Sequence, residues 1–174
     1  MKRAQVSVVI ILFVLSLAVT AWAQPASFTV GNITAQPGER VSGFLEVPAG
    51  VDAGTRIPIT IIHGQQPGPV LAVVAGVHGY EYAPVVALQR LPARLSPQEI
   101  SGTVIFVHIA NLPSFLHRTI YYNPLDGKNL NRVFPGKADG TQSERIAYVL
   151  TQEVIARAHF LVDLHGGDGN EALR

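Results

Sequence analysis

The sequence contains no cysteine among its 174 residues. Disulfide bonds are therefore excluded as a source of stability, and so is the attachment of a lipid to a cysteine. It also lacks a large excess of charge of either sign, with 13 basic and 12 acidic residues. Such a chain has no basic field to attract nucleic acid, so we expect no nucleic-acid partner. We find no internal repeat, low-complexity tract or interdomain linker, and the length predicts one domain.

The N-terminus has the pattern of a secretory signal peptide. Lys2 and Arg3 precede the apolar run Val8–Phe13, and the small-x-small triplet 21–23 predicts cleavage before Gln24. The apolar run is shorter than the ~20 residues that a membrane span needs. We expect residues 1–23 to be removed and residues 24–174 to form a periplasmic or secreted domain without a membrane partner. Losing the two N-terminal charges changes the formal net charge from +1 to −1.

Strand patterns occupy about residues 28–63. Val41–Val47 is bounded by turn residues on both sides, and isoleucine alternates with other residues from 57 to 61. Pro58 predicts an edge position, because proline cannot donate to a central ladder. We expect this strand pair to lie towards one edge of a sheet.

A strand, a helix and another strand follow in order. Val70–Ala75 is apolar without alternation, which predicts a strand buried on both faces. Pro84–Leu91 predicts a helix, since proline is tolerated in the first turn, where its missing N–H costs nothing. Thr103–Ile109 predicts a second buried strand. This order is a βαβ unit, and the two strands of such a unit pair in parallel.

The last third of the chain predicts a long loop, a helix and a third buried strand. Asn111–Gly140 has no sustained period and is rich in proline and glycine, which is typical of a functional loop. Residues 141–144 fit a capping box, and the apolar stripe behind them predicts a helix that reaches Ile155. Phe160–Leu164 predicts the strand. The whole pattern predicts an α/β fold with a mixed, largely parallel sheet flanked by helices.

Two histidines and a glutamate follow the ends of two of these strands. His78 and Glu81 come directly after Val70–Ala75, and His165 comes directly after Phe160–Leu164. Because the carboxyl ends of parallel strands meet at one edge of a sheet, we expect the three side chains to converge. Catalytic zinc takes three ligands of these types and keeps one position open. The alternative is that they are ordinary polar loop residues, since one H-x-x-E pair is a weak motif.

Three motifs together are more specific than that pair. They are GVHGYE at 76–81, NLNRVFPG at 129–136 and DLHGG at 163–167. In this order they resemble the zinc carboxypeptidase-like hydrolases, and within that group the succinylglutamate desuccinylase/aspartoacylase branch. The resemblance runs from about Gly31 to the last residue. It implies a carboxypeptidase-like sheet, here without its C-terminal strands.

The resemblance also implies the roles of particular residues. His78, Glu81 and His165 match the ligands of one zinc ion per chain. Asn131 and Arg132 match the pair that holds a carboxylate of a small-molecule substrate, a role that suits the planar fork of a guanidinium.

Several further residues are weaker candidates. Arg118 could polarise the scissile carbonyl, as another arginine of the family does. Asp163 could orient a metal ligand from behind, although an aspartate at a strand end often bonds to the backbone instead. Asp126 and Gly127 predict only a turn. The histidines that match no metal motif are predicted to be structural: His63, His108, His117 and His159.

The implied activity is zinc-dependent hydrolysis of the amide bond of an N-acyl amino acid. A periplasmic metallocarboxypeptidase acting on peptides or cell-wall fragments is an alternative, because a carboxylate clamp serves both reactions. In the family, the glutamate that serves as general base comes from a segment beyond the second histidine motif, and no glutamate here matches it. We therefore expect the sequence to be the N-terminal part of such a hydrolase or, if naturally truncated, a non-catalytic zinc-binding module. The sequence does not indicate an oligomeric state.

Overall fold

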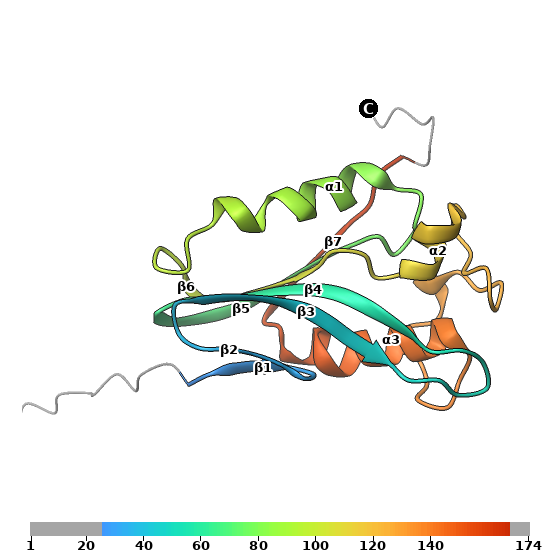
Figure 1. The fold of residues 1–174 in the computed structure, drawn as a ribbon, viewed down its shortest axis with the longest axis horizontal. Coiled ribbons are helices and arrows are strands. Elements are labelled where there is room, and N and C mark those ends of the chain that lie inside the picture. The colour runs from blue at the N-terminus through green and yellow to red at the C-terminus, as the bar shows by residue number, and fades with distance from the viewer. Residues whose placement is uncertain (1–25, 168–174) are drawn as a thin grey trace, which may run out of the picture.

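The computed structural model describes residues 26–167, which form a sheet covered by helices on both faces (Figure 1). The helices are α1 (Tyr82–Arg90), α2 (Leu112–His117) and α3 (Gln142–Glu153). Short 3-10 turns are η1 (Pro92–Arg94), η2 (Leu130–Arg132) and η3 (Ile155–Arg157). The predicted signal peptide lies outside the described residues. No helix in the described part has the length and apolar composition to cross a membrane.

The main sheet has five strands in the order β3-β4-β6-β5-β7. Antiparallel pairing joins β3 to β4 and β4 to β6, whereas β6, β5 and β7 pair in parallel. The predicted mixed α/β fold and the parallel βαβ pair are therefore confirmed. These strands are β3 (Glu39–Val47), β4 (Thr55–His63), β5 (Gln66–Ala75), β6 (Ser101–Val107) and β7 (Phe160–Leu164), and a separate hairpin joins β1 (Phe28–Val30) to β2 (Ile33–Ala35).

The core lies in two layers, one on each face of the sheet. On one face, α1 packs Val85 and Leu88 against Val73 and Phe106. On the other face, α3 and the β1-β2 hairpin cover the remaining side chains of the same strands (Figure 1). Successive residues of β5 enter opposite layers, so β5 is buried on both faces, as its apolar run predicts.

The α3 helix begins as predicted. The backbone N–H of Thr141 donates to Glu144 Oε2 at 2.9 Å, which forms the capping box. The buried Arg145 guanidinium donates to four backbone carbonyls and to Asp52. These bonds tie α3 to the turn between β3 and β4.

Three local predictions are wrong. Phe160–Leu164 is a strand but is not buried, because β7 is outermost in the described sheet. Phe160, Leu161 and Val162 are 62%, 46% and 44% exposed.

The second wrong prediction is that of Pro58, which lies on the internal strand β4 rather than at an edge. It is tolerated there because it lies just past the last β4–β6 register pair, where only its carbonyl accepts, from the His108 N–H.

The third wrong prediction concerns residues 111–140, which are not without secondary structure. They contain α2 and η2. Each begins at an asparagine whose side chain accepts a backbone N–H, Asn111 for α2 and Asn129 for η2. Elements of six and three residues are too short to produce a sequence period.

Candidate metal centre

The first half of the site is a tight turn at the carboxyl end of β5. Gly76 has φ +70°, and its carbonyl accepts from the Asn111 N–H at 2.8 Å, which joins the turn to the start of α2. Gly79 lies directly against α2, where an added Cβ would be 2.2 Å from the Phe115 nitrogen. Glycine at these two positions therefore brings His78 into the space between β5, α1 and α2.

The three predicted metal ligands meet in one cluster. One atom from each of His78, Glu81 and His165 lies within 4.8 Å of the others. Glu81 stands between the histidines: its Oε1 is 2.8 Å from His78 Nδ1, and its Oε2 is 2.9 Å from His165 Nδ1. His78 and Glu81 are buried at 8% and 5% exposure. Residues more than 80 positions apart thus converge at the strand ends, as the parallel order predicts.

Each imidazole is also held on its outer side. His165 Nε2, the ring nitrogen that does not contact Glu81, is 3.0 Å from Asp163 Oδ2. His78 Nε2 is 3.2 Å from Asn129 Oδ1, and the same oxygen accepts the N–H of Asn131 at 2.9 Å. Sequence reasoning missed Asn129. Its only sequence signal is the i, i+2 spacing from Asn131, which lets one asparagine side chain cap the turn that presents the other.

The predicted carboxylate-binding pair lies on η2, next to the cluster. Buried Leu130 anchors this turn, and the two residues that follow it, Asn131 and Arg132, are exposed. Asn131 and Asp163 line the same cavity of about 240 Å³, whose other walls are apolar. Arg132 Nη1 bonds to the carbonyl of Asn131, its neighbour in sequence. The structure therefore places Asn131 in a cavity with Asp163, while the Arg132 guanidinium bonds to the adjacent backbone carbonyl.

Arg118 lines a different cavity from Asn131. It ends α2 with a left-handed φ of 55° and lines a cavity of about 590 Å³ with Tyr80, Tyr82 and Phe115. Asn131 and Asp163 do not line that cavity. Tyr121 contacts the cluster directly, with its ring centroid 5.1 Å from that of His78 in an edge-on arrangement.

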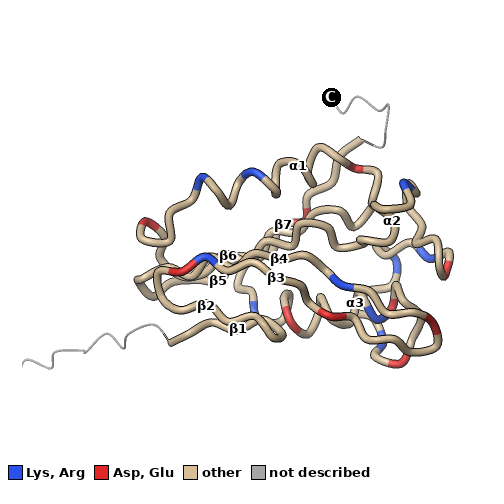
Figure 2. The backbone as a smooth tube through the Cα atoms, viewed as in Figure 1, with Lys and Arg blue, Asp and Glu red and all other residues tan. Residues whose placement is uncertain are grey.

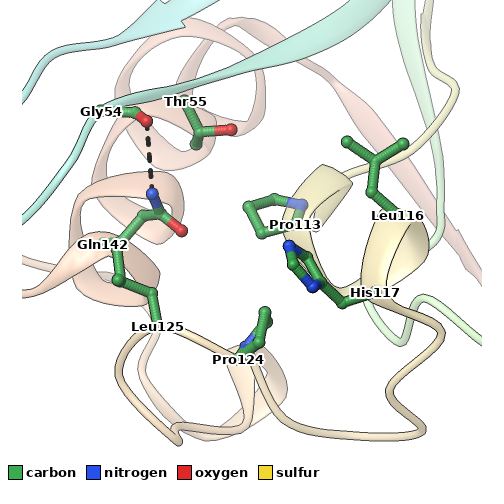
Figure 3. A pocket seen from close by; sticks show the side chains of 8 residues that line it. All are labelled: Gly54, Thr55, Pro113, Leu116, His117, Pro124, Leu125 and Gln142. Carbon is green, nitrogen blue, oxygen red and sulfur yellow. Dashed lines mark hydrogen bonds between the residues drawn. The ribbon is translucent and has the colours of Figure 1, made fainter.

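The remaining histidines are outside the cluster. His63 bonds to Thr103 and the Ala26 carbonyl, and His159 Nδ1 accepts the N–H of Val70, so their predicted structural role is confirmed. His108 bonds to Thr60 and to the Leu88 carbonyl. His117 lines a cavity of about 320 Å³ between α2, α3 and the start of β4 (Figure 3). That cavity contains none of the predicted site residues.

Comparison with known proteins identifies the family. Residues 67–173 match the model of the succinylglutamate desuccinylase/aspartoacylase catalytic domain. The chain belongs to this family. Its fold matches part of the solved structures of succinylglutamate desuccinylase/aspartoacylase proteins, and the predicted family resemblance is confirmed.

Three relatives show how far the similarity extends. The N-alpha-acetyl-L-2,4-diaminobutyric acid deacetylase of Halomonas elongata is 37% identical over 131 residues, which cover 72% of this chain and 37% of the relative. The product-bound ectoine utilization protein EutE (DoeB) of Ruegeria pomeroyi is 32% identical with a TM-score of 0.70, over 83% of this chain and 44% of that one. An aspartoacylase family protein of Mesorhizobium loti is 34% identical with a TM-score of 0.69, over 75% and 41%. This chain therefore spans less than half the length of these relatives.

Proposed function

We propose that His78, Glu81 and His165 hold a zinc ion in a hydrolase that removes the acyl group from an N-acyl amino acid. The observation that carries this proposal is the orientation of the two imidazoles. The Asp163 carboxylate can only accept, so the facing Nε2 of His165 carries its hydrogen. In the neutral ring, Nδ1 then has a lone pair, which faces Glu81 Oε2 at 2.9 Å.

The same reasoning applies to His78. Asn129 Oδ1 accepts an N–H from Asn131 and is therefore an acceptor for His78 Nε2 as well. His78 Nδ1 is left with a lone pair that faces Glu81 Oε1 at 2.8 Å. Three electron-pair donors directed at one another repel unless a cation or additional protons lie between them.

A zinc ion fits this set of donors. Two imidazole nitrogens and a carboxylate are the protein ligands of many catalytic zinc sites, and outer partners such as Asn129 and Asp163 keep each ring in the ligating tautomer. When bound there, zinc would supply Lewis acidity, which polarises a carbonyl and makes water a better nucleophile.

The substrate would be anchored by its carboxylate. We assign this role to the Asn131 amide and the Arg132 guanidinium, which must leave its present bond to the Asn131 carbonyl to reach a ligand. Neither acidic side chain of the cluster is free to move the proton to the leaving nitrogen, because Glu81 is assigned to the metal and Asp163 accepts the N–H of His165. The name of the Halomonas relative, a deacetylase of an acetylated amino acid, supports this class of reaction. We also propose that the protein is exported, from the sequence of residues 1–23.

Metal analysis tests the metal centre, and a substrate panel tests the reaction. We expect one zinc per purified chain and preferential hydrolysis of N-acetyl and N-succinyl amino acids over dipeptides. Equal zinc content in the wild type, His78→Ala and His165→Ala would overturn the metal assignment. Zinc binding without turnover of any member of the panel would leave a zinc-binding module, and preference for dipeptides would favour the carboxypeptidase alternative.

Arg132→Ala tests the anchor in the active protein. Loss of a charge-assisted pair costs about 2–4 kcal/mol, or roughly 30- to 1,000-fold in kcat/KM. Most of the loss should appear in KM, and Arg132→Lys should rescue poorly because lysine lacks the two-pronged geometry. With the wild type, a substrate analogue that has a neutral amide in place of the carboxylate should show a similar loss of kcat/KM. With Arg132→Ala, changing the substrate to this analogue should lower kcat/KM little further. Fully additive losses would show that the arginine and the carboxylate do not meet.

A further inference from the structure

A groove with several polar side chains lies on the α1 face of the sheet, outside the metal centre. Its volume is about 440 Å³, and it lies between β3, β4, the residues that follow β6, and the α1-η1 corner. Apolar side chains form part of its walls, and its polar lining consists of Arg40, Ser42, Thr60, Gln89 and His108. None of these residues has a role in the proposed deacylase.

Three of these side chains form a hydrogen-bonded relay. Ser42 Oγ is 2.8 Å from Thr60 Oγ1, which is 2.7 Å from His108 Nε2. The other ring nitrogen, Nδ1, is 3.0 Å from the Leu88 carbonyl. Thr60 is buried and Ser42 is exposed, so the relay connects a half-buried histidine to the surface of the groove.

The hydrogens of this relay have a defined direction. A carbonyl only accepts, so His108 Nδ1 carries a hydrogen. In the neutral ring, Nε2 then accepts the Thr60 hydroxyl hydrogen, and Thr60 Oγ1 accepts the hydrogen of Ser42. Ser42 presents only lone pairs to the groove. Burial lowers the pKa of His108 more than its bond to the Leu88 carbonyl raises it, which favours this neutral form.

Protonation of His108 reverses the relay. His108 Nε2 then donates to Thr60, the Thr60 hydroxyl donates to Ser42, and the Ser42 hydrogen is released towards the groove. The groove gains a hydrogen-bond donor and a positive charge in one step. An oxyanion in the groove would be stabilised by both changes, and a bound oxyanion would in turn favour the protonated ring.

Arg40 adds a fixed positive charge on the same side of the sheet. It lies two residues before Ser42 on β3, and alternate residues of a strand share a face. Its Nη2 donates to the Leu95 carbonyl, and no carboxylate pairs with it among the residues that the structure describes. The described residues that line the groove come from β3, β4, α1, η1 and the segment after β6. Among them, Arg40 is the one charged side chain besides the titratable His108. We propose that this groove binds a small oxyanion, a phosphate or a carboxylate, together with a proton on His108.

NMR titration of the histidine rings of the whole chain tests this proposal. The pKa of His108 would be followed without an anion, with inorganic phosphate and with acetate, its resonance assigned by its loss in His108→Gln. We expect the effective anion to raise the pKa of His108 by roughly 0.5–1 unit, less than for an opposite charge in direct contact. A response to phosphate alone, to acetate alone or to both identifies the ligand and supports the site. A response to neither overturns it.

The exposed ring of His117, which does not line the groove, reports non-specific screening. An equal pKa change at His117 and His108 would therefore overturn the proposal. Arg40→Gln should weaken anion binding at all pH values, because it removes the fixed charge. Ser42→Ala is a surface change that should keep the fold but abolish most of the anion-dependent change in the His108 pKa. If the full anion effect persists in Ser42→Ala, the relay does not carry it.

Discussion

His78 lies in a buried turn between β5, α1 and α2, whereas His165 follows the exposed strand β7. The His78 side chain is 10% exposed and the His165 side chain 33%. The first has a neutral outer partner, Asn129, and the second a carboxylate, Asp163. Glu81 joins the two halves, since it contacts both rings and its Oε2 also accepts the N–H of Gly166. One half of the metal centre is thus built into the core (the core half), and the other follows β7, the outermost strand of the described sheet (the edge half).

Removal of either histidine should have the largest effect. We expect His78→Ala and His165→Ala each to weaken zinc binding by more than roughly 100-fold, the upper range for loss of an outer partner. The two variants should differ when zinc is absent. His78→Ala removes a buried ring that packs edge-on against Tyr121 and bonds to Asn129, and should lower the free energy of unfolding by about 1–3 kcal/mol. The more exposed His165 should change it by about 0.5 kcal/mol or less when replaced by alanine. Competition with a chelating dye and urea unfolding in EDTA measure the two quantities. Equal stability losses without zinc would contradict the distinction between a core half and an edge half.

The glycines of the two halves provide a matched pair of variants. A Cβ at Gly79 would be 2.2 Å from the Phe115 nitrogen and 2.3 Å from the Ser114 carbonyl carbon, both fixed in the backbone of α2. A Cβ at Gly166 would be 3.1 Å from Pro84 Cδ, which can move by a few tenths of an ångström. We expect Gly79→Ala to lower the free energy of unfolding by about 3 kcal/mol, or roughly 6–12 °C in Tm, and Gly166→Ala by about 1 kcal/mol or less. Similar Tm values for the two variants would show that the edge half is packed as tightly as the core half.

The outer partners should have smaller effects that differ between the halves. Asn129→Ala leaves the His78 ring without its acceptor and should weaken zinc binding by about 10- to 100-fold. Asp163→Asn can keep an acceptor oxygen near His165 and loses only the charge, so we expect a loss near the lower end, about 10-fold. Asn131→Ala is the control, because its backbone N–H still donates to Asn129 while its side chain is removed. Calorimetric titration with zinc measures all three. A loss in Asn131→Ala equal to that in Asn129→Ala would show that the side chain of Asn129 does not act on His78.

The same difference explains what the sequence could predict. Val70–Ala75 and Phe160–Leu164 are apolar runs followed by polar ligands, so the strands, their parallel order and the convergence of His78, Glu81 and His165 could be inferred. The exposure of β7 could not be inferred, because an apolar run has the same residue types whether or not a neighbouring element covers it. Asn129 was also missed, since its role depends on the direction of one amide oxygen in space rather than on any spacing to His78.

The α3 capping box differs from the metal centre in that the chain's own groups satisfy its charge. Charged residues of both signs are interspersed along the described backbone (Figure 2), and Glu144 is paired with Lys128 at 3.0 Å. The Thr141 N–H, followed by Lys128, lowers the pKa of Glu144 to about 2 from its ordinary value of 4.5. A lowered folded-state pKa stabilises the fold above about pH 4.5, and this stabilisation is lost as the pH falls towards 2.

Glu144→Gln should therefore have the smallest effect, and one that depends on pH without any metal. The full pKa difference corresponds to about 3 kcal/mol, and solvent screening of this partly exposed carboxylate reduces the expected loss at pH 7 to about 1–2 kcal/mol. The difference between wild type and variant should shrink below pH 4.5 and approach zero near pH 2, as Glu144 becomes protonated. Urea unfolding of both proteins in EDTA at several pH values measures this difference. A difference that stays constant with pH would mean that the side chain acts only as a neutral hydrogen-bond acceptor, and that the box does not depend on its charge.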